Sequence, residues 1–113
     1  GDEILRCVSG AIREEVDSVD LVARYGGEEF VVILPGHDVD RAMLIAEDIR
    51  LAVASLNFDR ISTGLHVTIS IGVHAGVPTG RHNQDQWVRD ADEALYMSKA
   101  GGRNRVTLFG AAH

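Results

Sequence analysis

A pair of glycines lies between two runs of residues that favour β-strands, and this pair constrains the fold more than any other part of the sequence. Leu21 to Tyr25 precedes Gly26-Gly27, and Phe30 to Leu34 follows the pair after two glutamates. Glycine adopts positive φ at little steric cost, and short glycine-containing connections join antiparallel strands. The sequence therefore predicts a β-hairpin with two acidic side chains next to its turn.

Three segments carry apolar residues at helical spacing, so each is predicted to be a helix. The first covers about residues 2–16, and the second runs from the capping residue Asp38 to about residue 56. The third surrounds Trp87 and ends before the glycine pair at 101–102. These helices lie before and after the predicted hairpin, which indicates an α+β fold.

Leu65 to Val73 alternates apolar and polar residues, which predicts a strand over that range, and Val106 to Phe109 predicts a short closing strand. Residues 75–84 are rich in glycine, proline and asparagine and are expected to form a loop. The element order fits one domain over residues 1–113 with a ferredoxin-like, antiparallel sheet and flanking helices. In that arrangement an earlier strand would pair beside the hairpin, so we expect the first strand to be missing from the chain.

Composition and charge are those of an ordinary globular domain. The sequence contains no apolar run long enough to span a bilayer and does not start like a signal peptide, so we expect a cytoplasmic domain. The chain has 113 residues, 45% of them hydrophobic, a net charge of −6 and a pI near 5.2. This charge argues against a nucleic acid polymer or an anionic lipid surface as partner. Cys7 is the single cysteine, so an internal disulfide is excluded, and its apolar neighbours predict a half-buried position on the first helix.

The residues alone leave two interpretations of the hairpin open. Glu28 and Glu29 follow the turn directly, and strand alternation sends neighbouring side chains to opposite faces. They are either an ordinary exposed hairpin end or a pair of carboxylates that hold a ligand. Lys99 and Arg103 are likewise either a solvated helix end or two cations at i, i+4 spacing on one side of the third helix.

Four stretches, in the same order and at the same spacing, resemble motifs of the GGDEF-domain diguanylate cyclases. The first is the hairpin turn, residues 24–30, which reads RYGGEEF with glutamate in the third motif place. The others are GDEIL at 1–5, VTISIGV at 67–73, and the stretch from ADEALY to KAGGRN at 91–104. The resemblance covers essentially the whole chain and implies the nucleotidyl cyclase-type fold of that family.

The resemblance implies roles for the two glutamates of the motif. Glu28 matches the carboxylate that ligates divalent cations, normally Mg²⁺ or else Mn²⁺, which prefer carboxylate and phosphate oxygens. Glu29 matches the fourth motif position, which acts in catalysis through metal binding or by helping to deprotonate the 3′-hydroxyl of the substrate. Both are therefore expected to be catalytic residues and metal ligands.

The resemblance also implies a set of substrate-binding residues. Gly26 and Gly27 match the turn that lets GTP phosphates approach the backbone, and Asp2 matches a residue that hydrogen-bonds the guanine edge. Lys99 and Arg103 match the cations that hold the terminal phosphates. Asp92 and Tyr96 also belong to a family motif and are expected to be structural, whereas the role of Arg24 stays open.

The activity that the resemblance implies is the condensation of two GTP molecules into cyclic di-GMP, with release of pyrophosphate. One domain binds one GTP, so a two-fold homodimer of domains is expected, with a sensor or receiver domain elsewhere in the parent protein. The parent is cytoplasmic or tethered to a membrane. A catalytically silent GTP-binding module and a ferredoxin-like sensing or dimerisation domain are the alternatives.

Two departures from the family pattern limit what this chain is expected to do alone. The family places a metal-binding Asp and a guanine-binding Asn before the first helix, upstream of Gly1, so we expect little product from the 113-residue chain. Many relatives carry Arg-x-x-Asp before the hairpin, where the product binds and inhibits. Here that stretch is Asp17 to Asp20, and an aspartate in place of the arginine would repel a phosphate, so no inhibition through this site is expected.

Overall fold

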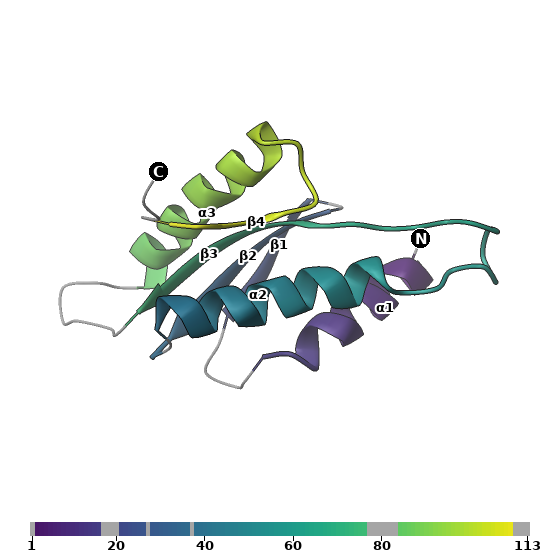
Figure 1. Cartoon of the computed structure of the whole chain (residues 1–113), viewed down its shortest axis with the longest axis horizontal. Coiled ribbons are helices and arrows are strands. Elements are labelled where there is room, and N and C mark those ends of the chain that lie inside the picture. The colour runs from purple at the N-terminus through teal and green to yellow at the C-terminus, as the bar shows by residue number, and fades with distance from the viewer. Residues whose placement is uncertain (1, 17–20, 27, 37, 77–83, 110–113) are drawn as a thin grey trace.

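The computed structural model of the chain describes residues 2–16, 21–26, 28–36, 38–76 and 84–109. Within these residues the strands form a single sheet, and the helices pack against it (Figure 1). In chain order they are α1 (Asp2–Arg13), β1 (Leu21–Gly26), β2 (Glu29–Pro35), α2 (Val39–Ala54), β3 (Ser70–Gly76), α3 (Gln84–Ala100) and β4 (Val106–Leu108).

The four strands lie in the order β1-β2-β3-β4 and form a mixed sheet. The hairpin pair β1–β2 is antiparallel as predicted, but β2–β3 and β3–β4 are parallel. The α+β fold with flanking helices is confirmed, and its expected antiparallel sheet is corrected to a mixed one. The reason is that a helix connects each of these later strands to the next, and a helical crossover returns the chain in the same direction.

Helices cover both faces of the sheet, with α1 and α2 on one face and α3 on the other (Figure 1). Alternate residues of β2 follow this division. Phe30, Val32 and Leu34 pack with α1 and α2, whereas Val31 and Ile33 pack with Trp87, Ala91 and Leu95 of α3. Both faces of β2 are buried, which is why its sequence is a continuous apolar run.

The sheet order leaves no open edge on β2, which has β1 on one side and β3 on the other. The additional strand expected beside the hairpin has two possible places. It could pair with the outer edge of β1, or it could lie between β2 and β3 and separate them. Among the described residues neither arrangement is present. The Glu29↔Ser70 pairing that joins β2 to β3 thus places the start of β3 directly beside the hairpin turn.

The helix α3 approaches β3 closely at Gly72. A Cβ atom built on Gly72 would lie 2.0 Å from the backbone oxygen of Ala91 and 2.3 Å from the backbone nitrogen of Leu95. No side chain fits at those distances, so glycine allows the helix backbone to rest on the strand backbone. This contact fixes the height of α3 above the sheet.

The strand predicted from Leu65 begins later, at Ser70. Ser70 pairs with Glu29, the first residue of β2, so residues 65–69 extend past the end of the neighbouring strand. An extended segment with no strand beside it cannot form a ladder, although Ile69 is buried in the core. The alternation of apolar residues therefore predicted the burial of Ile69 correctly, but it predicted a strand that starts five residues too early.

The helix predictions are confirmed with shorter ends and one correction. Asp38 caps α2, because its Oδ1 accepts a 2.8 Å hydrogen bond from the backbone N–H of Arg41. The helix α1 ends at Arg13 instead of residue 16, because the N–H of Glu15 bonds the carbonyl of Ile12 at 3.1 Å and tightens the last turn. Cys7 lies on α1 as predicted but is exposed instead of half-buried.

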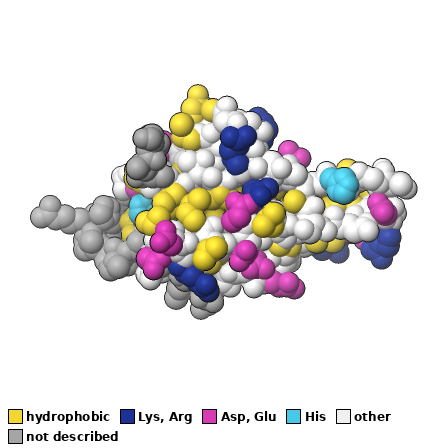
Figure 2. Space-filling model, in the orientation of Figure 1, with side chains coloured by type: hydrophobic (Ala, Val, Ile, Leu, Met, Phe, Trp, Pro, Cys, Tyr) yellow, Lys and Arg dark blue, Asp and Glu magenta, His cyan; other side chains and the backbone are white. Residues whose placement is uncertain are grey.

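The surface agrees with the acidic composition. On the face shown in Figure 2, acidic side chains lie over α2, and Lys and Arg side chains are scattered instead of gathered into one patch. None of the described helices is long and apolar enough to cross a membrane.

The contact at Gly72 gives a stability prediction. We expect Gly72→Ala to lower the free energy of unfolding by about 3 kcal/mol, because the methyl group would force the α3 backbone away from the sheet. Urea denaturation measures the loss. Gly10→Ala is the control, since a Cβ atom at Gly10 meets nothing within 4 Å on the exposed side of α1; it should stabilise the chain by about 0.5 to 1 kcal/mol. Equal midpoints for wild type and Gly72→Ala would contradict the close packing.

Candidate functional site

The hairpin turn folds the carboxylate of Glu29 back over Gly26. Gly26 is the Cα partner of Glu29, and the pairing shifts between Arg24 and Gly26 in a bulge. A Cβ atom built on Gly26 would lie 3.2 Å from both Cδ and Oε1 of Glu29. The small size of Gly26 therefore leaves the space that this carboxylate occupies.

Two cations from the far end of the sequence meet that carboxylate. Lys99 Nζ lies 3.2 Å from Oε1 of Glu29, and Arg103 Nη1 lies 3.5 Å from Oε2. The exposed side-chain fractions are 24% for Glu29, 33% for Lys99 and 56% for Arg103, so all three stay within reach of a ligand. We call these three residues the ionic cluster. At this exposure the two ion pairs contribute little to stability.

Arg103 reaches the cluster through a left-handed turn. The sequence predicted Lys99 and Arg103 on one side of a helix, but α3 ends at Ala100 and Arg103 lies beyond it. We call residues 101–105 the α3–β4 turn. Its φ angles are +121° at Gly102, +65° at Arg103 and +46° at Asn104. Non-glycine residues rarely adopt positive φ, and such backbone strain gathers at functional sites.

Two serines that the sequence interpretation missed hold this region in place. The Ser70 hydroxyl accepts a 3.2 Å hydrogen bond from the backbone N–H of Asn104. The hydroxyl of Ser98, which is fully buried, donates to the carbonyl of Ile71 at 2.8 Å and lies 2.8 Å from Oγ1 of Thr107. A sequence signal for Ser98 existed, because it is a polar residue at helical spacing from the apolar face of α3.

The two motif glutamates lie in different surroundings. Glu28 is exposed in the turn, and within the described residues its carboxylate has no hydrogen-bond or ion-pair partner. Its backbone carbonyl accepts a 2.8 Å hydrogen bond from the N–H of Ser70. Only Glu29 belongs to the ionic cluster, so the Glu29 carboxylate is paired with cations and the Glu28 carboxylate is exposed to solvent.

Several predicted residues lie outside this cluster or outside the described structure. Gly27 and residues 17–20 are not among the described residues, nor is the side chain of Asp2. Asp92 is exposed, and Tyr96 is 67% exposed. Neither of these two packs into the core of the described structure, and the structural role expected for them stays a prediction.

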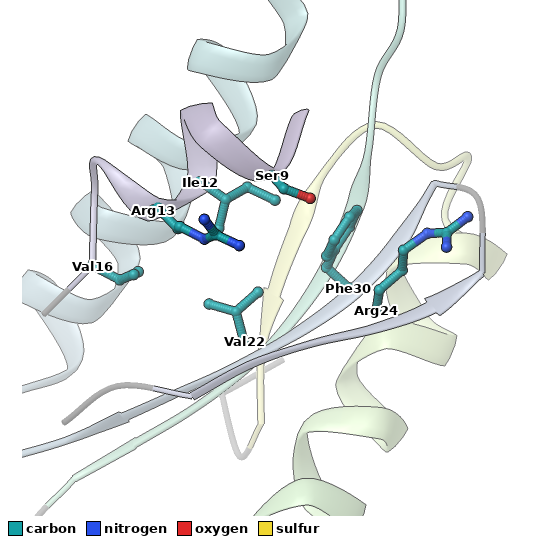
Figure 3. A pocket seen from close by; sticks show the side chains of 7 residues that line it. All are labelled: Ser9, Ile12, Arg13, Val16, Val22, Arg24 and Phe30. Atoms are coloured by element: carbon teal, nitrogen blue, oxygen red, sulfur yellow. The ribbon is translucent and has the colours of Figure 1, made fainter. Parts of the chain in front are cut away.

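A hollow of about 300 Å³ lies between α1 and the hairpin, and Arg13 and Arg24 are both part of its lining (Figure 3). Ile12, Val22 and Phe30 give it an apolar wall. In Figure 3 the guanidinium of Arg24 points away from that of Arg13. None of the ionic-cluster residues lines the hollow, so Arg24 belongs to different surroundings and its role stays open.

Almost the whole chain matches one family of domains. The family model described as "Diguanylate cyclase, GGDEF domain" covers residues 1–105. The chain belongs to this GGDEF family. The matched range includes the hairpin turn and the ionic cluster. It confirms the family membership that the motif at residues 24–30 predicted.

Relatives of this GGDEF domain match it over nearly its full length. The diguanylate cyclase DosC of Escherichia coli is 38% identical over 112 residues, which cover 99% of this chain and 24% of DosC. The response regulator PleD of Caulobacter vibrioides is 44% identical over 109 residues, covering 94% of this chain and 24% of PleD. The chain thus spans about a quarter of the length of these curated relatives.

Solved structures share the fold of this GGDEF domain. The GGDEF domain of DgcB from Caulobacter crescentus, solved in complex with c-di-GMP, superposes with a TM-score of 0.75 at 32% identity, covering 97% of this chain and 65% of that chain. The active GGEEF domain of a diguanylate cyclase from Vibrio cholerae gives a TM-score of 0.75 at 28% identity, covering 98% and 69%. The nucleotidyl cyclase-type fold is therefore confirmed.

The donor atoms at the hairpin suit a divalent metal, which nucleotidyl cyclases of this family generally need. Glu28 and Glu29 supply hard carboxylate oxygens, and Glu28 has no competing partner within the described structure. Those same residues contain no group of three or more His, Cys, Asp or Glu that could hold a metal.

The geometry of the ionic cluster gives a prediction for anion binding in the absence of metal. Glu29 occupies both cations, so an incoming phosphate must compete with its carboxylate. We expect Glu29→Gln to strengthen the binding of inorganic tripolyphosphate in EDTA by about tenfold, and Lys99→Gln to weaken it by a similar factor. Isothermal titration calorimetry measures both constants.

Glu28→Gln is the matched control for this experiment. It removes the same charge from the neighbouring residue, whose carboxylate touches neither cation, so its effect should be less than about twofold. Equal strengthening by Glu28→Gln and Glu29→Gln would show that overall charge, and not the cluster, governs the binding.

Proposed function

We propose that this GGDEF domain condenses two GTP molecules into cyclic di-GMP and two pyrophosphates, as half of a two-domain enzyme. The observation that carries the proposal is the ionic cluster, in which Lys99 and Arg103 converge on the motif carboxylate Glu29. A carboxylate and two cations at the end of an exposed hairpin form a site for a phosphorylated ligand that arrives with its own cations.

The cations are the groups that bind the terminal phosphates of GTP. Lys99 offers a compact ammonium and Arg103 a planar guanidinium, and both bind phosphate oxygens with charge-assisted hydrogen bonds. In the structure described here the Glu29 carboxylate neutralises both. We infer that the Glu29 carboxylate keeps the two cations oriented until the substrate binds. The phosphates of GTP then replace this carboxylate.

Other residues of the motif complete the proposed nucleotide site. Gly26 and Gly27 let phosphates approach the backbone of the turn, and Asp2 at the start of α1 accepts hydrogen bonds from the guanine edge. Glu28 and Glu29 would hold Mg²⁺ or Mn²⁺, which when bound supplies neutralisation of the phosphate charge. Freed from its cations, the Glu29 carboxylate is available to accept a proton from a 3′-hydroxyl.

The reaction joins the two nucleotides by two equivalent steps. In each step the 3′-oxygen of one GTP attacks the α-phosphorus of the other, its proton leaves with a base, and the bond to pyrophosphate breaks. Each domain presents one ionic cluster, so we propose that two copies meet around a two-fold axis. Positioning of the two substrates, together with charge neutralisation, accounts for most of the catalysis.

The names of two relatives suggest how the proposed activity is regulated. PleD is named a response regulator, and the diguanylate cyclase SiaD of Pseudomonas aeruginosa was solved in complex with its activator SiaC. We propose that a sensor or receiver domain likewise controls the pairing of the present domain. Because its substrate is GTP, we place it in the cytoplasm.

The proposal predicts separate effects of the cluster residues on turnover in the full-length protein that carries this chain. Lys99→Gln should lower kcat/KM for GTP by about a hundredfold, because it removes a charge that stabilises the departing phosphates. Glu29→Gln should abolish measurable turnover while the protein still binds GTP. Chromatography of cyclic di-GMP after incubation with GTP and Mg²⁺ gives the rate.

Arg89→Gln is the control, since Arg89 is an exposed residue of the same helix that bonds Gln86 and not the cluster. It should leave the rate within about twofold. A wild-type protein that binds GTP and forms no cyclic di-GMP would instead identify a catalytically silent regulatory module.

A further inference from the structure

The α3–β4 turn, which places Arg103, is connected to α2 by one side-chain contact. Arg50 Nη1 donates a 2.9 Å hydrogen bond to Oδ1 of Asn104, although the two residues are 54 positions apart in the sequence. Arg50 belongs to α2, which lies on the opposite face of the sheet from α3 (Figure 1). The contact therefore joins the two helical layers at the edge of the phosphate site.

The guanidinium of Arg50 is held in one orientation before it reaches the turn. Its Nε donates a 2.6 Å hydrogen bond to Oε1 of Glu47, and Nη2 pairs with the same oxygen. The side chain of Arg50 is 19% exposed, so most of it is packed. Orientation by Glu47 and partial burial make Arg50 a rigid donor to Asn104.

Asn104 is the residue of the turn that receives this donor. Its backbone N–H is bound by the Ser70 hydroxyl at 3.2 Å, and its side chain by Arg50. Both it and Arg103 have positive φ, a conformation that most residues leave when nothing holds them. Two contacts from two different elements thus hold Asn104 in a conformation that also fixes the residue before it.

Arg103 needs this external support because its own side chain is held weakly. It is 56% exposed, and its contact to Glu29 is the longer of the two in the ionic cluster at 3.5 Å. Its backbone N–H bonds the carbonyl of Ser98 at 2.9 Å, and its own carbonyl accepts a 3.0 Å hydrogen bond from Nε of Arg105. These bonds hold the backbone of Arg103 and leave its side chain free to move. The direction of the guanidinium therefore depends on the conformation of the turn.

We infer that Arg50 is a positioning residue for phosphate binding, which acts by holding Asn104 so that Arg103 points toward the terminal phosphates. The inference rests on the function proposed above. Arg50 itself does not touch the ionic cluster. Its loss should therefore weaken the binding of a triphosphate group and leave a ligand that lacks the terminal phosphates unaffected.

Arg50→Met tests this in the 113-residue chain, because methionine keeps an unbranched apolar stem and loses every hydrogen bond. We expect the dissociation constant for inorganic tripolyphosphate, measured by calorimetry, to rise about tenfold. Amide hydrogen exchange should accelerate at residues 103–105. Arg50→Lys, which can still donate to Asn104, should recover most of the affinity.

Arg41→Met is the matched control. Arg41 lies on the same helix, its side chain is exposed, and its hydrogen bond to Asp38 is made by the backbone and not by the side chain. It should bind tripolyphosphate as the wild type does. GMP serves as the ligand without terminal phosphates, and its affinity should be the same in all variants. Thermal unfolding of each variant separates a local effect from a global loss of structure.

Arg103→Met distinguishes failure of this inference from failure of the proposed function. If Arg103→Met leaves tripolyphosphate binding unchanged, the assignment of the cations to phosphates is wrong, and the inference falls with it. If Arg103→Met weakens binding but Arg50→Met does not, or if Arg50→Met changes only the melting temperature, the positioning role of Arg50 is overturned.

Discussion

The close approach of α3 to β3 is the constraint on which the candidate site depends. Gly72 has no side chain, so the backbone of the helix lies against the backbone of the strand near Ala91 and Leu95. The same helix carries Lys99 near its end, and β3 begins beside Glu29. A larger separation between helix and strand would move the ammonium away from the carboxylate. The distances in the ionic cluster are therefore set by packing at a residue with no chemical role.

Local signals in the sequence predicted the elements, and non-local contacts decided how they assemble. The hairpin, the Asp38 cap and the three helices follow from short-range patterns of apolar residues and turn formers. The pairing of β2 with β3 does not, because strand direction depends on the crossover that α2 makes between them. Ser70 begins the strand where a neighbour becomes available, which the alternation from Leu65 could not show.

The sequence named the three residues of the ionic cluster but did not predict how they are arranged. Family resemblance named Glu29, Lys99 and Arg103, and the structure brings all three together. The assumption of a continuing helix was wrong for Arg103, because the glycines at 101–102 end α3 and the turn continues in the left-handed region. Arg50 and Asn104 are 54 residues apart and carry no pattern that links them, so only the folded chain shows their contact.

The sequence separation inside the ionic cluster has a consequence for how the domain forms. Glu29 and Lys99 are 70 residues apart, and Arg103 is 74 residues from Glu29. During synthesis the hairpin leaves the ribosome long before either cation has been made. Contacts of such long range form late, after the intervening loop has been closed. A nascent chain consequently presents an acidic hairpin without its two cations, and the ionic cluster can form only when α3 packs against the finished sheet.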